Sequence, residues 1–457
     1  MSLPSEWYVS TESIMNNTLS TSLGKSTSSK TIRLPDFSGP HLAKRYASER
    51  RFRILGISSV GAAGIILLIL LSSIVSKGYS AFWLHKVELN ITFSSEVLNP
   101  DGGAVEEVKL KEANYLALIH NALKQKFPAA IGNRCKIRML YGIISPKADL
   151  VLRNMVLSNP SLVGTTKTVS LKLSDDLDNL SKGFINRDLP ESDRRVKDLQ
   201  IDWYDQLKSE GHIHSVFNTD FFTTGDSRDP EEAGIYSALI GSILTLTITL
   251  LISFPVGVMA AVYLEEFAPN NRFIDFIEVN INNLAAVPSI VFGLLGLAVF
   301  LNFFGLPRSA PLVGGLVLAL MTLPTIIIAA RSALKAVSPS IREAALGLGA
   351  SPLQVVTHHV LPMAMPGILT GTIIGMAQAL GETAPLLMIG MVAFIVDIPQ
   401  TFTDPATVMS IQVYIWADSP ERAFVERTSA GIMVLLSFLV LMNAVAILLR
   451  KRFERRC

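Results

Sequence analysis

Charged residues are scarce in this sequence. They make up 17% of its 457 residues, whereas hydrophobic residues make up 49%. An average soluble domain is about 25% charged. The formal net charge is only +2, and no basic tract is interleaved with aromatic residues, so nothing indicates a nucleic-acid partner. A chain this apolar is typical of a membrane protein.

Cysteine is nearly absent. Cys135 lies in a polar region and Cys457 is the last residue, so neither an intrachain disulfide framework nor a CxxC metal site is expected. His358 and His359 are adjacent, and adjacent residues lie on different faces of a helix, so they are not expected to form a two-histidine metal site. We expect no metal and no cofactor bound by this chain.

Enzyme motifs are missing as well. No Ser/His/Asp set, HExxH motif or pair of carboxylates has convincing spacing within one domain. Gly24-Lys25-Ser26 resembles the end of a phosphate-binding loop, but such a loop needs a glycine at position 19 and a preceding strand. Position 19 is Leu19. We therefore expect no enzyme activity here, and expect any ATP to bind a different chain.

Long apolar runs predict an all-α polytopic membrane protein, because about 20 residues of helix cross the hydrocarbon layer. Six spans are expected, near 54–75, 235–264, 281–304, 312–330, 366–396 and 430–449. Basic residues before the first run and after the last place both termini in the cytoplasm. A cleaved signal peptide is the alternative for the first run, but the run is long and follows a tail of about 50 residues.

These runs divide the chain into domains. Residues 1–52 are rich in serine and threonine and then basic, which predicts a disordered cytoplasmic tail. The first transmembrane helix occupies 53–79, and the other five helices form a core over 234–450. Residues 451–457 are a basic cytoplasmic tail. The polar block 80–233 is then expected outside the membrane, in the periplasm.

The polar block has the pattern of an α+β domain. Apolar residues alternate with polar ones at 87–91 and 169–173, as in strands, and recur at helical spacing over 116–123 before Pro128. A block of this size can bury a core of its own. Its role is open between a docking platform for a substrate-binding protein and a structural or assembly role.

A polar interruption over 338–362 separates the fourth and fifth apolar runs. Ser340, followed three residues later by Glu343, predicts a capping box that begins a short helix. Gly349 is placed to end that helix in a left-handed turn. Residues 351–354, Ser-Pro-Leu-Gln, repeat the start signal. The interruption is therefore predicted to form two short helices joined by a glycine.

This interruption resembles the EAA loop of bacterial ABC-importer permeases. The matching residues are Glu343, Ala344, Ala345, Gly349, Leu361 and Pro362. His359 stands where the family usually has isoleucine, and Pro362 is expected to end the second helix. In that family the loop docks in a cleft of the ATPase subunit. The resemblance implies that these residues, His359 included, couple this chain to a separate ATPase.

Two further stretches, 261–297 and 379–390, resemble the A-type permease subunit of phosphate ABC importers. The resemblance covers the chain from about Gly234 onward. It implies a type I (MetI-like) permease core in the bacterial inner membrane that transports phosphate. It also implies three protein partners: a C-type permease, an ATPase dimer that binds ATP, and a periplasmic phosphate-binding protein.

Other functions stay open. The same machine could carry another oxyanion, sulfate or molybdate. A membrane-anchored sensor or scaffold is a second alternative, although it would need no ATPase dock. A proton-coupled secondary transporter using Glu382 is a third, but it predicts an inverted repeat, and none is evident.

Glu382 is the most informative single residue of the expected spans. An ionisable side chain inside a membrane helix is costly unless it faces protein or water. A stripe of small residues that would admit another helix precedes it, at Gly367, Gly371, Gly375 and Ala379. Gln378 lies one turn before Glu382, and Pro385 leaves a backbone carbonyl free beside it. Glu382 is either a gate of the translocation pathway or a structural tie, and unchanged transport in Glu382→Gln would exclude the first.

Arg331 is the cation to consider beside Glu382. It lies at the inner end of the fourth span, whereas Glu382 is about 24 Å into the fifth by helix rise. A direct pair is therefore not expected. Arg331 is predicted to be an interfacial anchor or, alternatively, an anion contact at the inner mouth of the pathway.

Overall fold

The computed structural model describes residues 40–98, 107–392 and 394–453. Internal contacts divide the chain into residues 1–68 and residues 69–457. In its described part the first unit is helical: α1, Pro40–Gly78, begins there and continues into the second. Disorder was expected through residue 52 and is wrong for 40–52, because this basic stretch contains strong helix formers and no glycine. The rest of that tail and Cys457 lie outside the described residues.

The polar block contains a three-stranded antiparallel sheet with the order β2-β1-β3. β1 (Trp83–Thr92) pairs with β2 (Thr166–Lys172) and β3 (Ile213–Phe217), so that Val87 lies opposite both Leu171 and Ile213. The alternation at Val87, Leu89 and Ile91 buries their side chains against helices. These helices are α2 (Ser95–Leu98), α3 (Glu107–Glu112), α4 (Tyr115–Lys126), α5 (Arg134–Tyr141), α6 (Ala148–Ser158), α7 (Asp175–Ser181) and α8 (Asp198–Ser209). The strands and the helix expected from periodicity are present, as β1, β2 and α4.

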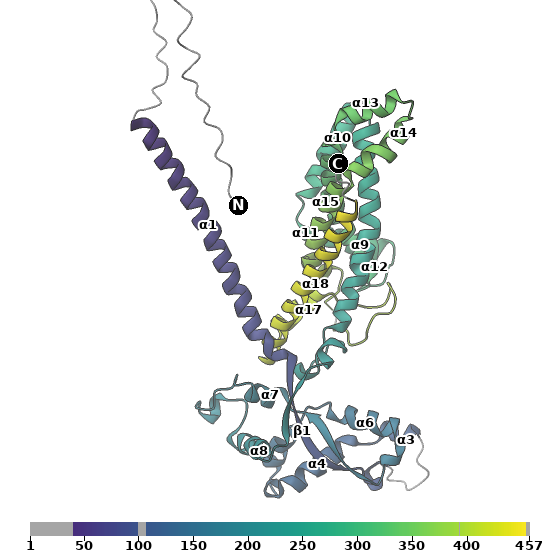
Figure 1. Cartoon of the computed structure of the whole chain (residues 1–457). Coiled ribbons are helices and arrows are strands. Elements are labelled where there is room, and N and C mark those ends of the chain that lie inside the picture. Colours follow the sequence, from purple (N-terminus) through teal and green to yellow (C-terminus); the bar gives the residue numbers. More distant parts are fainter. Residues whose placement is uncertain (1–39, 99–106, 393, 454–457) are drawn as a thin grey trace, which may run out of the picture. The chain divides into compact units, whose positions relative to one another are not determined.

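The second half of the chain is a helical bundle (Figure 1). Its longer helices are α9 (Tyr236–Val262), α10 (Arg272–Ala285), α12 (Pro311–Lys335), α15 (Leu361–Gly381) and α18 (Ala423–Phe453). Its shorter helices are α11 (Ser289–Gly296), α13 (Pro339–Gly347), α14 (Pro352–Gln354), α16 (Ala384–Met388) and α17 (Met409–Asp418). In the described ranges, five helices are long and apolar enough to span a membrane, or six if the bent pair α10 and α11 counts as one.

Two expected spans are broken. α10 and the apolar helix that begins with α11 meet at 100°, because Pro288, at the N-cap of α11, lacks an N–H and excludes the helical conformation from the residue before it. The span expected over 366–396 ends early. α15 stops at Gly381, Glu382 is extended (φ −73°, ψ 128°), and only the short α16 follows.

The small-residue stripe of α15 packs against α12, as the spacing of its glycines predicts. A Cβ added at Gly371 would lie 2.1 Å from the Cβ of Ala329, and one at Gly367 would lie 2.7 Å from the Cβ of Ala333. Such distances are impossible for real side chains, so only glycine permits this approach. The end of α12 and the start of α15 are therefore held in direct contact.

Candidate functional site

The loop that resembles an EAA motif forms α13 and α14, which lie with α10 at one end of the bundle (Figure 1). The first capping prediction is wrong. α13 begins at Pro339 with Ser338 as its N-cap, and the Ser340 hydroxyl is 2.8 Å from that of Ser338. Proline is pre-set for the first helical position, so the helix starts two residues before the predicted Ser340/Glu343 box can form.

The second half of the loop follows the prediction at its start and not at its end. Gly349 has a φ of +87°. The Ser351/Gln354 capping box is present, with the Ser351 N–H donating to Gln354 Oε1 over 2.9 Å. Pro362, however, does not end the helix. A π-helical turn, Val355–Val360, continues into α15, and Pro362 occupies the first turn of α15, where a missing N–H is tolerated.

The loop presents apolar side chains at its tip. Leu348 is 90% exposed, and Leu346 and Leu353 are also exposed. We call these three residues the tip leucines. Of the predicted coupling residues, Glu343, Ala344, Gly349 and His359 are exposed, Leu361 and Pro362 are half-buried, and Ala345 is buried. Clustered exposed leucines on a polar loop indicate a surface that a protein partner covers.

Arg342 fastens this loop to the bundle. Its guanidinium donates to both carboxylate oxygens of Glu266, over 2.7 Å and 3.2 Å. It also donates to the backbone carbonyls of Val337 (2.7 Å) and Leu334 (3.0 Å). The hydrogen bonds that Arg342 donates to Glu266 raise the pKa of Arg342. α13 is thus joined to the π turn after α9, Tyr263–Phe267, and to the end of α12.

Arg331 is engaged by carboxylates. Its Nη2 lies 2.6 Å from Glu278 Oε1 and its Nε 3.5 Å from Glu265 Oε2. Lys335 Nζ lies 3.6 Å from the same Glu265 oxygen. These contacts connect α10, α12 and the π turn, and both roles expected for Arg331 stay predictions. The sequence alone did not indicate this pairing, because Arg331 and its carboxylate partners are more than 50 residues apart.

Glu382 lies just past the end of α15 and is half-buried. Its carbonyl accepts a hydrogen bond from Ser410 Oγ over 3.2 Å. Over the described ranges its carboxylate has no hydrogen bond or ion pair, and neither bond type joins it to Arg331 or Gln378. Gln378 is exposed on α15. The prediction that Glu382 lies inside a helix is wrong. Its carboxylate lies at a break between two helices.

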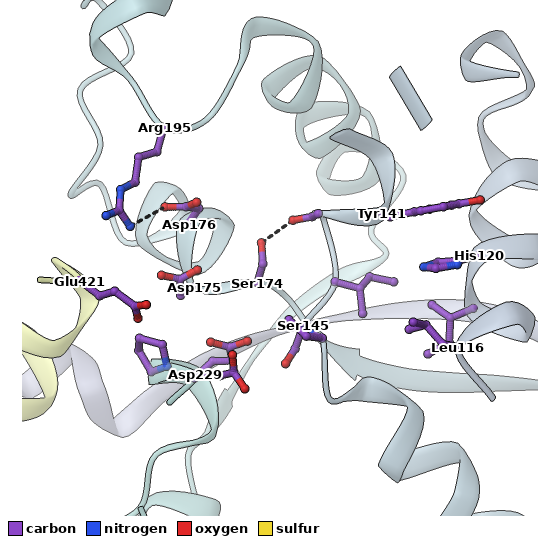
Figure 2. Close-up of a pocket in the computed structure, with 16 residues that line it drawn as sticks. Leu116, His120, Tyr141, Ser145, Ser174, Asp175, Asp176, Arg195, Asp229 and Glu421 are labelled. Carbon is purple, nitrogen blue, oxygen red and sulfur yellow. Dashed lines mark hydrogen bonds and ion pairs between the residues drawn. The ribbon is translucent and has the colours of Figure 1, made fainter. Parts of the chain in front are cut away.

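A separate cavity of about 430 Å³ gathers acidic side chains from distant parts of the chain (Figure 2). Asp175 and Asp176 come from α7, Asp229 and Glu231 from the segment before α9, and Glu421 from the loop before α18. Arg195 also lines the cavity, 4.0 Å from Asp176. The described residues contain no group of three or more side chains arranged to hold a metal. Nothing in the sequence signalled this cluster, because its members are spread over 175–421.

Burial and mutual repulsion hold four of these carboxylates, those of Asp175, Asp176, Glu231 and Glu421, toward their neutral forms. Glu231 is 4% exposed, and burial raises its pKa to about 7, with the Ser145 hydroxyl opposing the shift and Asp175 and Asp229 adding to it. Burial likewise raises the pKa of Asp175, Asp176 and Glu421. This contact between the α+β region and the bundle should therefore respond to pH.

Replacing Glu231 by glutamine should remove a pH dependence of stability. The folded protein keeps a proton that the unfolded chain releases between the ordinary pKa of 4.5 and about 7, so the free energy of unfolding falls as pH rises through that window. Glu231→Gln should therefore be more stable than wild type at pH 8, by at most about 3 kcal/mol, and little changed at pH 4. Thermal unfolding in detergent at both pH values measures this. Parallel pH curves for wild type and variant would contradict it, and the exposed Glu96→Gln is the control.

Comparison with known proteins assigns the two halves differently. Residues 40–191 match a domain of unknown function (DUF3333), and residues 253–457 match the binding-protein-dependent transport system inner membrane component family. The chain is 37% identical over 174 residues to the probable ABC transporter permease protein YqgI of Bacillus subtilis, which covers 38% of this chain and 58% of YqgI. It thus spans little more than half of that relative.

A second relative is matched over more of its length. The phosphate transport system permease protein PstA 1 of Mycobacterium tuberculosis is 30% identical over 229 residues, which cover 50% of this chain and 74% of PstA 1. A solved structure of the MetNI methionine ABC transporter is similar to 49% of this chain at 17% identity, with a TM-score of 0.38, which is too low to add to the assignment. On the sequence matches, this chain belongs to the PstA family of permeases, among the binding-protein-dependent transport system inner membrane components.

Proposed function

We propose that this chain is the permease subunit of an ATP-driven importer of inorganic phosphate, coupled to a separate ATPase. The similarity to PstA 1 supports phosphate as the substrate. The observation that carries the coupling role is the exposed loop of α13 and α14, with its tip leucines outward and Arg342 bound to Glu266 behind them. Its proposed partners are a C-type permease, an ATPase dimer that binds ATP, and a periplasmic phosphate-binding protein.

The contacts of Arg342 suggest how force would pass through the chain. A partner that displaces α13 acts on Glu266 at the end of α9 and on the last carbonyls of α12. α12 in turn contacts α15 through the glycine stripe. Movement of the ATPase would therefore reach three spans through one arginine and one helix interface. We propose this route for alternating access of the pathway.

The proposed topology has six spans with both termini in the cytoplasm, which requires the bent pair of α10 and α11 to count as one span. The α+β domain at 80–233 then lies in the periplasm and the loop at 338–362 in the cytoplasm. Glu382 and Gln378 are the proposed pathway residues. Arg331, which two carboxylates engage, is better suited to anchor the inner end of α12 than to bind a free anion.

Uptake of radiolabelled phosphate tests this function. Cells that lack this chain should regain phosphate uptake when the wild-type chain is supplied, and sulfate uptake, measured in parallel, should not change. Restored sulfate or molybdate uptake would contradict phosphate as the substrate, and no restored transport would favour a sensor or scaffold. In the same cells Glu382→Gln should lower phosphate uptake if the carboxylate gates the pathway, and full activity would make Glu382 a structural tie.

A further inference from the structure

A group of exposed aromatic side chains surrounds the point where α1 joins the sheet. Tyr79 is 59% exposed, Trp83 38%, Phe217 51% and Phe222 39%. We call these four residues the aromatic platform. They come from three segments: the turn Tyr79–Phe82 with the start of β1, the end of β3, and the turn Asp220–Phe222.

Three of the platform's rings, those of Trp83, Phe217 and Phe222, pack against one another. The Trp83 ring meets Phe217 edge to face, with centroids 5.9 Å apart, and Phe217 stacks on Phe222 at 6.2 Å. Phe222 also stacks on the partly buried Phe82 at 5.7 Å. Trp83 and Phe217 are direct partners in the β1–β3 register. Such packing fixes these three rings as one apolar surface that is still more than a third exposed.

Contacts with α18 place this surface at the end of the membrane spans. A Cβ added at Gly78 would lie 2.8 Å from the backbone nitrogen of Ala430, and Arg427 Nη1 donates to the carbonyl of Ala81 over 3.1 Å. Ala430 begins the apolar run of α18, and Arg427 lies three residues before it. On α1 the apolar run ends at Val75, shortly before Tyr79. On both helices the platform therefore lies level with the boundary of the hydrocarbon layer.

We propose that the aromatic platform is a lipid-contact surface that lies in the headgroup layer of the membrane, so that one edge of the α+β domain rests on the bilayer. Tryptophan and tyrosine concentrate at this depth because an apolar ring with a polar edge suits an interface. Lys77, in the last turn of α1, can extend its ammonium group into the same layer. The platform begins four residues after the apolar run of α1 ends at Val75, which favours lipid over a protein partner.

Fluorescence of Trp83 tests the proposal in the full chain reconstituted into liposomes. The chain has four tryptophans; Trp203 and Trp416 are buried, and Trp7 lies outside the described residues. The difference between Trp7→Phe and the double variant Trp7→Phe/Trp83→Phe isolates the emission of Trp83. Lipids brominated near the headgroup end of the acyl chain should lower that emission about twofold, and lipids brominated near the chain end should lower it less.

Two results would overturn the proposal. Quenching by aqueous acrylamide without quenching by brominated lipid would place Trp83 in water. Protection from both quenchers would mean that protein covers the platform, either a partner or a second copy. If Trp83→Phe fails to fold, Tyr79→Trp in the Trp7→Phe background supplies a second probe at the same depth, whose added emission brominated lipid should quench. The emission lost in Trp203→Phe, which belongs to the core of the α+β domain, is the control that brominated lipid should not reach.

Discussion

Replacing Arg342 by methionine should reduce phosphate uptake at least tenfold while the chain still inserts in the membrane. The variant keeps an unbranched side chain of similar length but loses the two bonds to Glu266 and those to the carbonyls of Val337 and Leu334. The Glu266 side chain is only 10% exposed, so it is left as a poorly solvated charge. If the variant loses about 2 kcal/mol of the free energy that holds α13 against the bundle, the equilibrium between attached and detached α13 changes about thirtyfold.

Two further measurements separate binding of the ATPase from transmission of its movement to the spans. Because the tip leucines stay in place, the ATPase should still co-purify with Arg342→Met, although uptake is lost. Exchanging the charges, Arg342→Glu with Glu266→Arg, should restore part of the uptake, since the pair is remade in reverse. Arg272→Met is the matched control, because Arg272 is exposed at the start of α10 and has no ion pair in the described part of the chain. Wild-type uptake in Arg342→Met would refute the proposed route of coupling.

The loop at 338–362 shows how far local sequence signals reach. The box at Ser351 and Gln354 and the turn at Gly349 were predicted because each depends on a few neighbouring residues. The prediction of a box at Ser340 is wrong because Pro339 also favours a helix start. The sequence shows both start signals but not which of them the helix uses. The prediction that Pro362 ends the helix is wrong because the π turn before it accommodates a residue without an N–H. Local signals thus predict where a helix begins or ends when no second signal nearby competes with them.

Features that depend on distant residues were beyond the sequence. Long apolar runs located most of the helices, but Glu382 was placed within a helix because the run continues in sequence after the backbone has turned. The pairing of Arg342 with Glu266 joins positions 76 residues apart, and no spacing rule connects them. The acidic cavity combines residues that only the packed structure brings together. The family resemblance located the loop, whereas packing alone shows what holds it.

Replacing Lys182 by methionine should destabilise the chain by about 3–5 kcal/mol, the cost of removing one member of a buried ion pair. Lys182 Nζ lies 2.7 Å from both Asp178 Oδ2 and Glu426 Oε1, and all three side chains are less than a tenth exposed. Burial alone would raise the pKa of Asp178, but hydrogen bonds from His85 and Lys182 outweigh it and lower the pKa. The variant would leave two buried carboxylates with one cationic partner fewer. Thermal or chemical unfolding in detergent measures the loss.

The comparison that decides the mechanism is with an exposed pair in the same domain. Arg187 and Asp205 form a bidentate pair, but both side chains are nearly half exposed, so Arg187→Met should cost less than about 1 kcal/mol. Adding Asp178→Asn and Glu426→Gln to Lys182→Met should recover most of the lost stability, because neutral amides do not carry the desolvation cost of a charge. Equal losses of unfolding free energy in Lys182→Met and Arg187→Met would contradict this account. If the triple variant regains stability but not phosphate uptake, the buried ions set the orientation of the α+β domain on α18 and are not needed for its stability.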